Sequence, residues 1–165
     1  KAFDTLLRLT QLLRGVLSSN SEFCPLGDEI RLIESYLEIE RARFEERLTV
    51  EVDVPDELRR IAVPALILQP LVENAVKHGI SENKKGGTIR ITACHGEIGG
   101  RPSLKLTVRD TGAGGGAESR GETSGVGLRN IRERLGAYYG DDARLTFTTE
   151  AAGGTAVEVE LPINR

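Results

Sequence analysis

The sequence has no methionine, only two cysteines and no long apolar run. Its longest apolar stretch, residues 61–68, is interrupted by Pro64, whereas a membrane-spanning helix needs about 18 or more apolar residues. No signal-peptide pattern is present. These absences argue against a membrane helix within the sequence. Because no initiator methionine precedes Lys1, we expect a fragment of a longer protein.

The two cysteines and the scattered basic residues argue against a metal site, a disulfide and binding to nucleic acids or anionic membranes. Cys24 and Cys94 are far apart, with no histidine nearby at a metal-ligand spacing, so two free thiols in a reducing cytosol are favoured over a disulfide. The formal net charge is −3, and the lysines and arginines form no cluster. Because nucleic acids and anionic membranes are usually bound by a basic patch, we expect neither as the main partner.

What is present is typical of one globular domain with a short helical addition. A chain of 165 residues, 39% of them hydrophobic, can bury a core without disulfides. Residues 2–19 carry apolar side chains at helical spacing, and so do residues 26–44, which have Asp28 and Glu29 in their first turn. We therefore predict a helical hairpin over residues 1–46. Its apolar seam either packs on its own domain or pairs with a second copy of the chain.

From residue 47 onward, strand and helix patterns alternate. Apolar residues at every second position predict strands, and apolar residues three or four apart predict helices. The predicted strands cover residues 48–54, 89–93, 104–108, 145–147 and 157–161, and the predicted helices cover residues 66–79 and 128–138. Glycine pairs between strands indicate tight turns and antiparallel pairing. For residues 47–165 we expect an α+β fold, with a helix layer on a mixed, largely antiparallel sheet.

Two polar residues occupy strand positions that face the predicted core. Asp110 continues the apolar face of residues 104–108, and a buried carboxylate is costly unless it is hydrogen-bonded. Either a bonding partner lies beside it, or Asp110 simply ends the strand and starts a turn. Thr155 shares the parity of Val157 and Val159. Threonine is common in strands, so Thr155 alone carries little weight.

The helix predicted over residues 66–79 has a polar face as well as an apolar one. The residues on the polar face are Glu73, Asn74, Lys77 and His78. Asparagine is a poor helix former, so its position in the middle of this helix slightly favours a functional role. The alternative is a solvated face that carries a Glu73–Lys77 ion pair.

Residues 111–127 form a glycine-rich segment that ends where a helix is predicted to begin. Such a loop can bring backbone N–H groups against phosphate oxygens, and a helix N terminus adds partial positive charge. Glycine richness is equally typical of a flexible linker. The segment contains neither a Walker A ending, Gly-Lys-Ser/Thr, nor a Gly-x-Gly-x-x-Gly that opens a βαβ unit, so those two phosphate-binding motifs are excluded.

Four short motifs follow one another along the chain. They are Leu-Val-Glu-Asn-Ala-Val-Lys-His-Gly at 71–79, Asp-Thr-Gly-Ala-Gly at 110–114, Gly-Val-Gly-Leu at 125–128 and Gly-Gly-Thr at 153–155. Each is weak to moderate alone. In this order they resemble the N box, G1 box, G2 box and closing Gly-Thr element of the ATPase superfamily that unites gyrase, a heat-shock chaperone, histidine kinases and mismatch-repair ATPases. The resemblance implies the Bergerat-type ATP-binding fold, a two-layer α/β sandwich.

The resemblance implies how the adenine of ATP is bound. By similarity, Asp110 accepts a hydrogen bond from the adenine amino group at the floor of the pocket, and Thr155 contacts the base through water. Gly112 and Gly114 let the backbone pass close to the adenine. Residues 113–126 are implied to be a mobile lid.

The same resemblance implies a second set of roles at the phosphates. Asn74 is the implied ligand of Mg²⁺, which bridges the phosphates of the nucleotide. Glu73 is implied to act as the base or to orient the attacking group, and Lys77 and His78 to face the phosphates. Phosphoryl transfer of this kind depends mainly on positioning and charge neutralisation. The residues implied to flank the phosphates are Gly125, Gly127 and Leu128.

Two longer stretches, residues 26–44 and 67–79, resemble the LytS-type sensor histidine kinases. The resemblance implies the ATP-binding catalytic domain of a two-component sensor kinase, which transfers the γ-phosphoryl group of ATP to a histidine for relay to a response regulator, here expected to be of the LytTR type. In such kinases the acceptor lies in an upstream Asn-Pro-His-Phe motif. Neither His78 nor His95 fits that motif, so we expect the acceptor helix upstream and no autophosphorylation of this chain alone.

The resemblance further implies a cytoplasmic domain of a membrane-anchored sensor and a hairpin that contributes to a homodimer. Two alternatives remain open. A serine kinase that acts as an anti-sigma factor shares the fold, but that family usually lacks a long helix like residues 26–44. A nucleotide-binding signalling module without activity would have no need for intact Glu73, Asn74 and Asp110.

Overall fold

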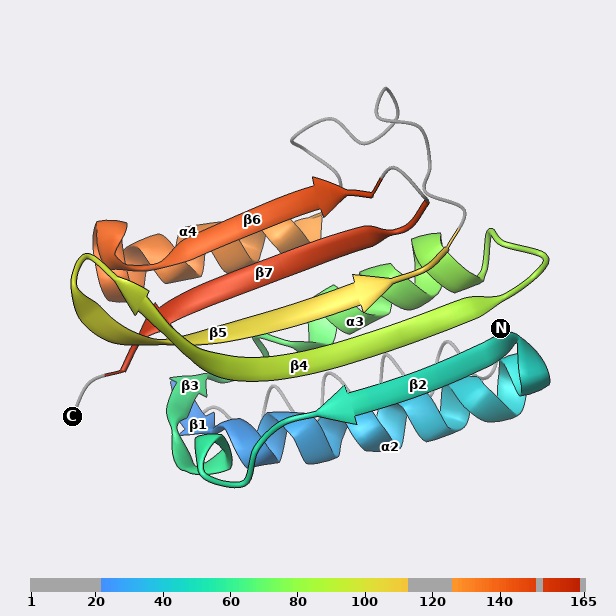
Figure 1. Cartoon of the computed structure of the whole chain (residues 1–165), viewed down its shortest axis with the longest axis horizontal. Coiled ribbons are helices and arrows are strands. Elements are labelled where there is room, and N and C mark those ends of the chain that lie inside the picture. Colours follow the sequence, from blue (N-terminus) through green and yellow to red (C-terminus); the bar gives the residue numbers. More distant parts are fainter. Residues whose placement is uncertain (1–21, 113–125, 151–152, 164–165) are drawn as a thin grey trace.

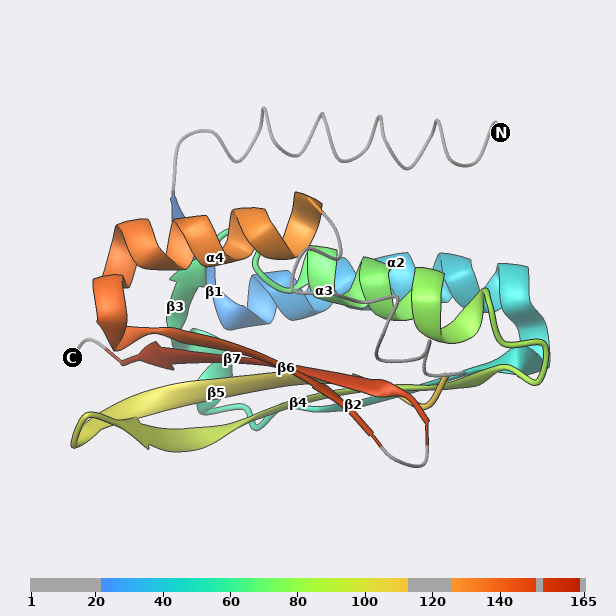
Figure 2. The same cartoon turned by 90° about the horizontal axis from the view of Figure 1, so that it is seen from above.

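The computed structural model describes residues 22–112, 126–150 and 153–163, and these form two layers (Figures 1 and 2). Three helices cover one face of a five-stranded sheet. The helix predicted over residues 2–19 lies outside the described residues. The main elements are β1 (Phe23–Pro25), α2 (Leu26–Phe44), β2 (Leu48–Asp53), β3 (Ala62–Pro64), α3 (Gln69–Asn74), the π-helical η3 (Ala75–Ile80), β4 (Gly87–Ile98), β5 (Arg101–Asp110), α4 (Val126–Tyr139), β6 (Arg144–Thr149) and β7 (Thr155–Pro162). Short 3₁₀ turns are η1 (Glu45–Arg47), η2 (Leu58–Arg60) and η4 (Gly140–Asp142).

The sheet has the strand order β2-β4-β5-β7-β6. Strand β2 pairs with β4 in parallel, and the other three pairings are antiparallel. The parallel pair needs a crossover connection, and α3 lies within it. The α+β class and the mixed, largely antiparallel sheet predicted from the sequence are therefore confirmed.

Helix α2 packs onto the sheet instead of presenting its apolar seam to solvent. The seam residues are all buried in one core with the inward side chains of the strands: Leu26, Ile30, Ile33, Leu37 and Phe44. Burying each large aliphatic side chain contributes about 1.5–3 kcal/mol. The structure thus places the seam of α2 on its own domain, and for the other helix of the predicted hairpin the two possibilities stay open.

A second, two-stranded sheet that the sequence did not predict joins β1 to β3. Phe23 lies opposite Pro64 and Cys24 opposite Val63 in antiparallel register. Each strand has only three residues, too few for a period of two to be recognised. The small sheet ties the start of α2 to the segment that precedes α3.

The helix predicted over residues 66–79 is shorter at its start and changes its winding halfway. Leu66 has a left-handed backbone with φ of 59°, so α3 begins only at Gln69, with Pro70 in its first turn. The helix then continues as η3. Wider π-helical turns interrupt α-helices most often at functional sites.

Among the described residues, no helix is long and apolar enough to span a membrane. Both cysteines are free: Cys94 is exposed and Cys24 is half-buried. Burial, and after it the neighbouring carboxylate of Glu29, raise the pKa of Cys24 to about 12.

We therefore expect the two thiols to differ in reactivity. At pH 8, Cys94 should react with iodoacetamide as an ordinary exposed thiol, and Cys24 on the order of 10²-fold more slowly because so little of it is thiolate. Mass spectrometry of a time course assigns each rate, and the variant Cys94→Ser serves as the control because it should remove only the fast phase. Similar rates at both positions would contradict the burial of Cys24.

Candidate functional site

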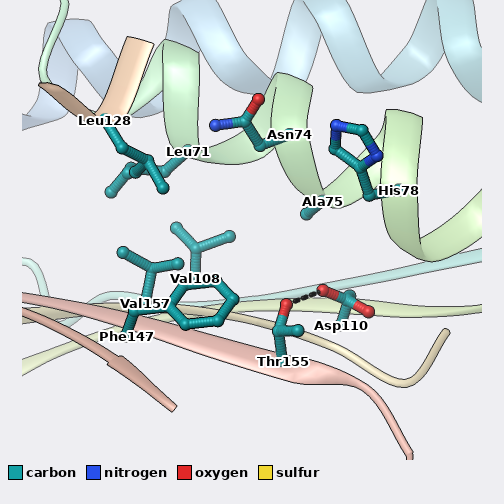
Figure 3. Close-up of a pocket in the computed structure, with 10 residues that line it drawn as sticks. All are labelled: Leu71, Asn74, Ala75, His78, Val108, Asp110, Leu128, Phe147, Thr155 and Val157. Carbon is teal, nitrogen blue, oxygen red and sulfur yellow. Dashed lines mark hydrogen bonds between the residues drawn. The ribbon is translucent and has the colours of Figure 1, made fainter. Parts of the chain in front are cut away.

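A pocket opens between the helix layer and the sheet, below α3 and η3 (Figure 3). Its lining residues come from six elements, α3, η3, β5, α4, β6 and β7: Leu71, Asn74, Ala75, His78, Val108, Asp110, Leu128, Phe147, Thr155 and Val157. One wall is helical and carries an amide and an imidazole, and the opposite wall is the inner face of the sheet. A carboxylate and a hydroxyl lie together at one end of that face.

Asp110 is the last residue of β5 and is buried, with 3% of its surface exposed. The hydroxyl of Thr155, opposite it on β7, donates a hydrogen bond to Oδ2, and the backbone N–H of Gly112 donates to Oδ1 at 3.0 Å. Two acceptor sites of the carboxylate are thus used, and an ionised carboxylate has about four. Asp110 has a fixed orientation and can accept a further donor from the pocket.

Three glycines bring the backbone against this carboxylate. An added Cβ at Gly79 would lie 2.5 Å from Oδ1 of Asp110, and one at Gly112 would lie 2.1 Å from the carbonyl oxygen of Gly79. Gly154 has φ of 96°, and its Cβ would lie 2.1 Å from the carbonyl oxygen of Asp110. No other residue type fits these positions without moving the chain.

Asn74 lies across the pocket from the carboxylate, near the end of α3. Its Nδ2 is buried and has no hydrogen-bond partner among the residues that the structure describes. Leaving a buried amide without a partner costs about 1–3 kcal/mol, so the position indicates a polar ligand. A 180° turn of the amide presents Oδ1 instead.

That oxygen makes the site compatible with Mg²⁺, which prefers oxygen ligands. No group of three or more His, Cys, Asp or Glu residues in the described ranges is arranged to hold a metal ion. None is needed, since Mg²⁺ in nucleotide sites is typically bound by one or two protein ligands plus phosphates and water. The residues present therefore fit the ion.

The structure brings together five of the residues singled out in the sequence: Asn74, His78, Asp110, Leu128 and Thr155. Gly112 lies next to Asp110. Gly127 lies by the start of α3, where an added Cβ would be 3.3 Å from Cβ of Pro70 and 4.0 Å from Nδ2 of Asn74. Gly114 and Gly125 lie outside the described residues.

The predicted residues Glu73 and Lys77 do not line the pocket. Lys77 is exposed. Glu73 accepts a hydrogen bond from Nε2 of Gln69 at 2.8 Å, and its charge is one of the causes, after burial and Glu40, that raise the pKa of Tyr36 on α2. His78 does line the pocket, and its Nδ1 lies 2.9 Å from Oε1 of Glu82.

The apolar part of the pocket was not predicted from the sequence. Its members are Leu71, Ala75, Val108, Phe147 and Val157. The ring of Phe147 is 38% exposed and points into the pocket from β6. Phe147 lies opposite Val157 on β7, and its position in the alternation of β6 could have indicated that it shares the inner face of the sheet. A largely apolar lining with a few placed polar groups is typical of sites for small molecules and cofactors.

Comparison with known proteins adds independent information. Residues 60–165 match the family described as histidine kinase-, DNA gyrase B- and HSP90-like ATPase, and residues 1–48 match the family described as histidine kinase. The sensor histidine kinase BtsS of Escherichia coli is 36% identical over 155 residues, which cover 93% of this chain and 26% of BtsS. The sensor protein LytS of Staphylococcus haemolyticus is 34% identical, with 98% of this chain and 29% of LytS covered.

The chain thus spans between a quarter and a third of the length of these two relatives. Among solved structures, the histidine kinase domain of a blue-light activated histidine kinase from Erythrobacter litoralis superposes with a TM-score of 0.61. The match covers 87% of this chain and 63% of that chain, at 21% identity. At this identity the likeness shows the fold alone.

Proposed function

The chain belongs to the family of histidine kinase-, DNA gyrase B- and HSP90-like ATPases, and from this premise we propose that it is the ATP-binding catalytic domain of a two-component sensor histidine kinase. The observation that carries the proposal is a pair of polar groups with unused hydrogen-bonding capacity at opposite sides of one largely apolar pocket. Asp110 has acceptor capacity to spare at the sheet, and Asn74 has a buried amide without a partner at the helix.

ATP fits this arrangement in one orientation. The adenine lies between the apolar walls with its amino group toward Asp110, and Thr155 holds the carboxylate and contacts the base through water. The triphosphate then extends toward Asn74 and the start of α4, where Gly127 and Leu128 lie. An N–H-rich helix start favours phosphate. The lid and the residues Gly114 and Gly125 belong to the same proposal.

Mg²⁺ is the proposed metal, with Asn74 as its protein ligand and the nucleotide phosphates as the others. When bound, the ion neutralises phosphate charge and favours phosphoryl transfer. His78 is proposed to contact the phosphates from the pocket wall. Glu73 and Lys77 lie outside the pocket lining, so a catalytic role for them requires that the phosphates extend beyond the lined part of the pocket. The role of Glu73 as the base, or as the group that orients the attacking group, stays a prediction.

The remaining roles concern the whole protein of which such a domain is a part. A histidine on an upstream helix receives the phosphoryl group, and a response regulator, of the LytTR type by resemblance, receives it next. Residues 1–46 are proposed as part of a helical hairpin that supports a homodimer, and residues 47–165 as the catalytic domain. Attachment to a membrane-anchored sensor completes the proposal. The relative BtsS, which is named a sensor histidine kinase, favours this over an anti-sigma serine kinase.

The proposal predicts nucleotide binding that depends on Mg²⁺ through Asn74. Isothermal titration calorimetry with ATP should show affinity that rises at least several-fold when Mg²⁺ is added, and the variant Asn74→Ala should lose that increment while keeping the affinity measured in EDTA. The reason is that Asn74 contacts the ion and the adenine is bound elsewhere. Serine at the exposed position Ser35 offers a control, since Ser35→Ala should change neither value.

A Mg²⁺ effect that persists in Asn74→Ala would remove Asn74 as the ligand. Absence of any binding at millimolar ATP would overturn the proposed function itself. The kinase step is then tested by adding the upstream helix in one polypeptide with this chain and measuring transfer of ³²P from the γ-position to an acid-labile phosphohistidine.

A further inference from the structure

The loop of residues 65–68 connects β3 to α3 and is held from two sides by charged side chains. Helix α3 lies between α2 and α4 in the helix layer (Figure 1). A glutamate from α2 and an arginine from α4 both reach the backbone of this loop. Both contacts are long-range in sequence, so neither is a local helix or turn interaction.

Glu29 of α2 makes the first contact. Its side chain is 3% exposed, and its two carboxylate oxygens accept hydrogen bonds from the backbone N–H of Leu66 at 2.7 Å and of Leu68 at 3.2 Å. Leu66 adopts a left-handed backbone with φ of 59°, a conformation that side chains disfavour and that persists only when its surroundings hold it. The carboxylate supplies part of that hold.

Leu68 connects the loop held by Glu29 to the first turn of α3. It is the residue at the N-terminal boundary of the helix, and its carbonyl oxygen accepts hydrogen bonds from the N–H groups of Leu71 and Val72, both at 3.1 Å. Asn74 follows six residues after Leu68, a distance of about 9 Å along a helix. One residue, Leu68, thus connects Glu29 through its N–H to the helix that carries Asn74 through its carbonyl oxygen.

Arg134 makes the second contact, from α4. Its Nη2 donates a hydrogen bond to the carbonyl oxygen of Ala65 at 2.6 Å. Helix α4 also carries Leu128, which lines the pocket. The bond therefore connects the helix of Leu128 to the loop that starts the helix of Asn74, and the two helical parts of the pocket wall share one point of attachment.

Packing alone does not account for Glu29. The neighbouring core residues of α2, Leu26, Ile30 and Ile33, are apolar, and a further apolar residue would fill the position at lower cost. Burial raises the pKa of Glu29 above its ordinary value, although the bonds from Leu66 and Leu68 oppose that rise. An acid with a raised pKa in the folded chain contributes stability below its unfolded pKa and loses it as the pH rises through the folded pKa, so the ionised form of Glu29 contributes less to stability than the protonated form.

We propose that Glu29 and Arg134 are positioning residues of the nucleotide site: they hold loop 65–68 from α2 and from α4, and thereby set the place of Asn74 relative to Leu128. The inference rests on the proposed function for its effect on nucleotide binding, but not for its effect on the loop. With this arrangement the position of Asn74 depends on α2, so that a movement of α2 displaces Asn74 through the bonds of Glu29 to the loop.

The test compares Glu29→Gln and Arg134→Gln with the matched surface variants Glu38→Gln on α2 and Arg132→Gln on α4, both at exposed positions. Hydrogen–deuterium exchange with mass spectrometry is measured for residues 66–80 and for β4 and β5. Calorimetry measures ATP affinity with and without Mg²⁺, at a temperature where every variant is folded. Arg134→Lys, which keeps a charged donor, is included as a rescue variant.

In Glu29→Gln and Arg134→Gln we expect faster hydrogen exchange that is confined to residues 66–80, with exchange in β4 and β5 unchanged. We also expect the Mg²⁺-dependent increment of ATP affinity to fall by about tenfold to a hundredfold. The double variant should be little worse than the more affected single variant, because both act through one loop. Arg134→Lys should recover part of the protection.

Uniformly faster exchange over the whole core would show a structural role only and overturn the inference, as would wild-type exchange in residues 66–80. If the unaltered chain binds no ATP, the proposed function fails, whereas the exchange data still decide whether Glu29 and Arg134 hold the loop. If Glu29→Gln does not fold, Arg134→Gln and its lysine rescue decide the same question.

Discussion

Replacing Gly79 by alanine is expected to weaken ATP binding severely in a chain that still folds. The added methyl group would lie 2.5 Å from Oδ1 and 2.6 Å from Cγ of Asp110, well inside contact distance. Asp110 would have to move, and its bonds from Gly112 and Thr155 would break. Loss of the adenine contact and distortion of its surroundings should weaken ATP binding on the order of 10²-fold or more, and overpacking should lower stability by about 1–3 kcal/mol.

The matched control is Gly136→Ala in α4, where an added Cβ meets nothing within 4 Å. There the substitution should leave ATP affinity unchanged and raise the free energy of unfolding by about 0.5–1 kcal/mol, because alanine favours a helix more than glycine does. Calorimetry and urea unfolding measure both quantities. Wild-type ATP affinity in Gly79→Ala would mean that Asp110 does not contact the base.

The structural reason for Gly79 could not be predicted from the motif that contains it. The sequence placed it at the end of the N box, without a role of its own, because the contact that explains it joins residues that are 31 positions apart (79 and 110). Its neighbour in space, Gly112, was assigned to the adenine by resemblance, and in the structure its nearest contact is Gly79 itself. Close backbone packing of this kind depends on tertiary structure, which periodicity does not encode.

The sheet side of the pocket could be predicted from the sequence alone. Side chains alternate between the two faces of a strand, so the parity of β5 and β7 placed Asp110 and Thr155 in the core. Their mutual hydrogen bond confirms that orientation. The order of strands and helices and the antiparallel hairpin of β4 and β5 were predicted for the same reason: both periods were clear over several residues.

The helical wall of the pocket was harder to predict from the sequence than the sheet wall. Helical spacing placed Asn74 on a polar face but did not show that its amide is buried, and it did not reveal that α3 changes into η3 after Asn74. Glu29 was read as an acidic residue of a first helical turn, which favours the helix dipole. Its real partners, at Leu66 and Leu68, lie 37 and 39 residues further along the chain.

Replacing Asp110 by asparagine should weaken ATP binding by about 1–3 kcal/mol, a factor of about 5 to 150. Asparagine is nearly the same size as aspartate, so the pocket keeps its shape. One of the two oxygens becomes an amide nitrogen that donates, however, and three donors then compete for one oxygen: the N–H of Gly112, the hydroxyl of Thr155 and the adenine amino group. At least one of them loses its partner in a buried site.

Inosine triphosphate sharpens this test, because it carries a carbonyl oxygen where ATP carries the amino group. The unaltered chain should prefer ATP, since a carboxylate at 3% exposure repels that oxygen. In Asp110→Asn the amide can donate to it, so the preference should shrink or reverse. Asp141→Asn, at an exposed position, should change neither affinity. An unaltered ratio of ATP to inosine triphosphate affinity in Asp110→Asn would place the base elsewhere, and Asp110 would then be explained by its bonds to Gly112 and Thr155 alone.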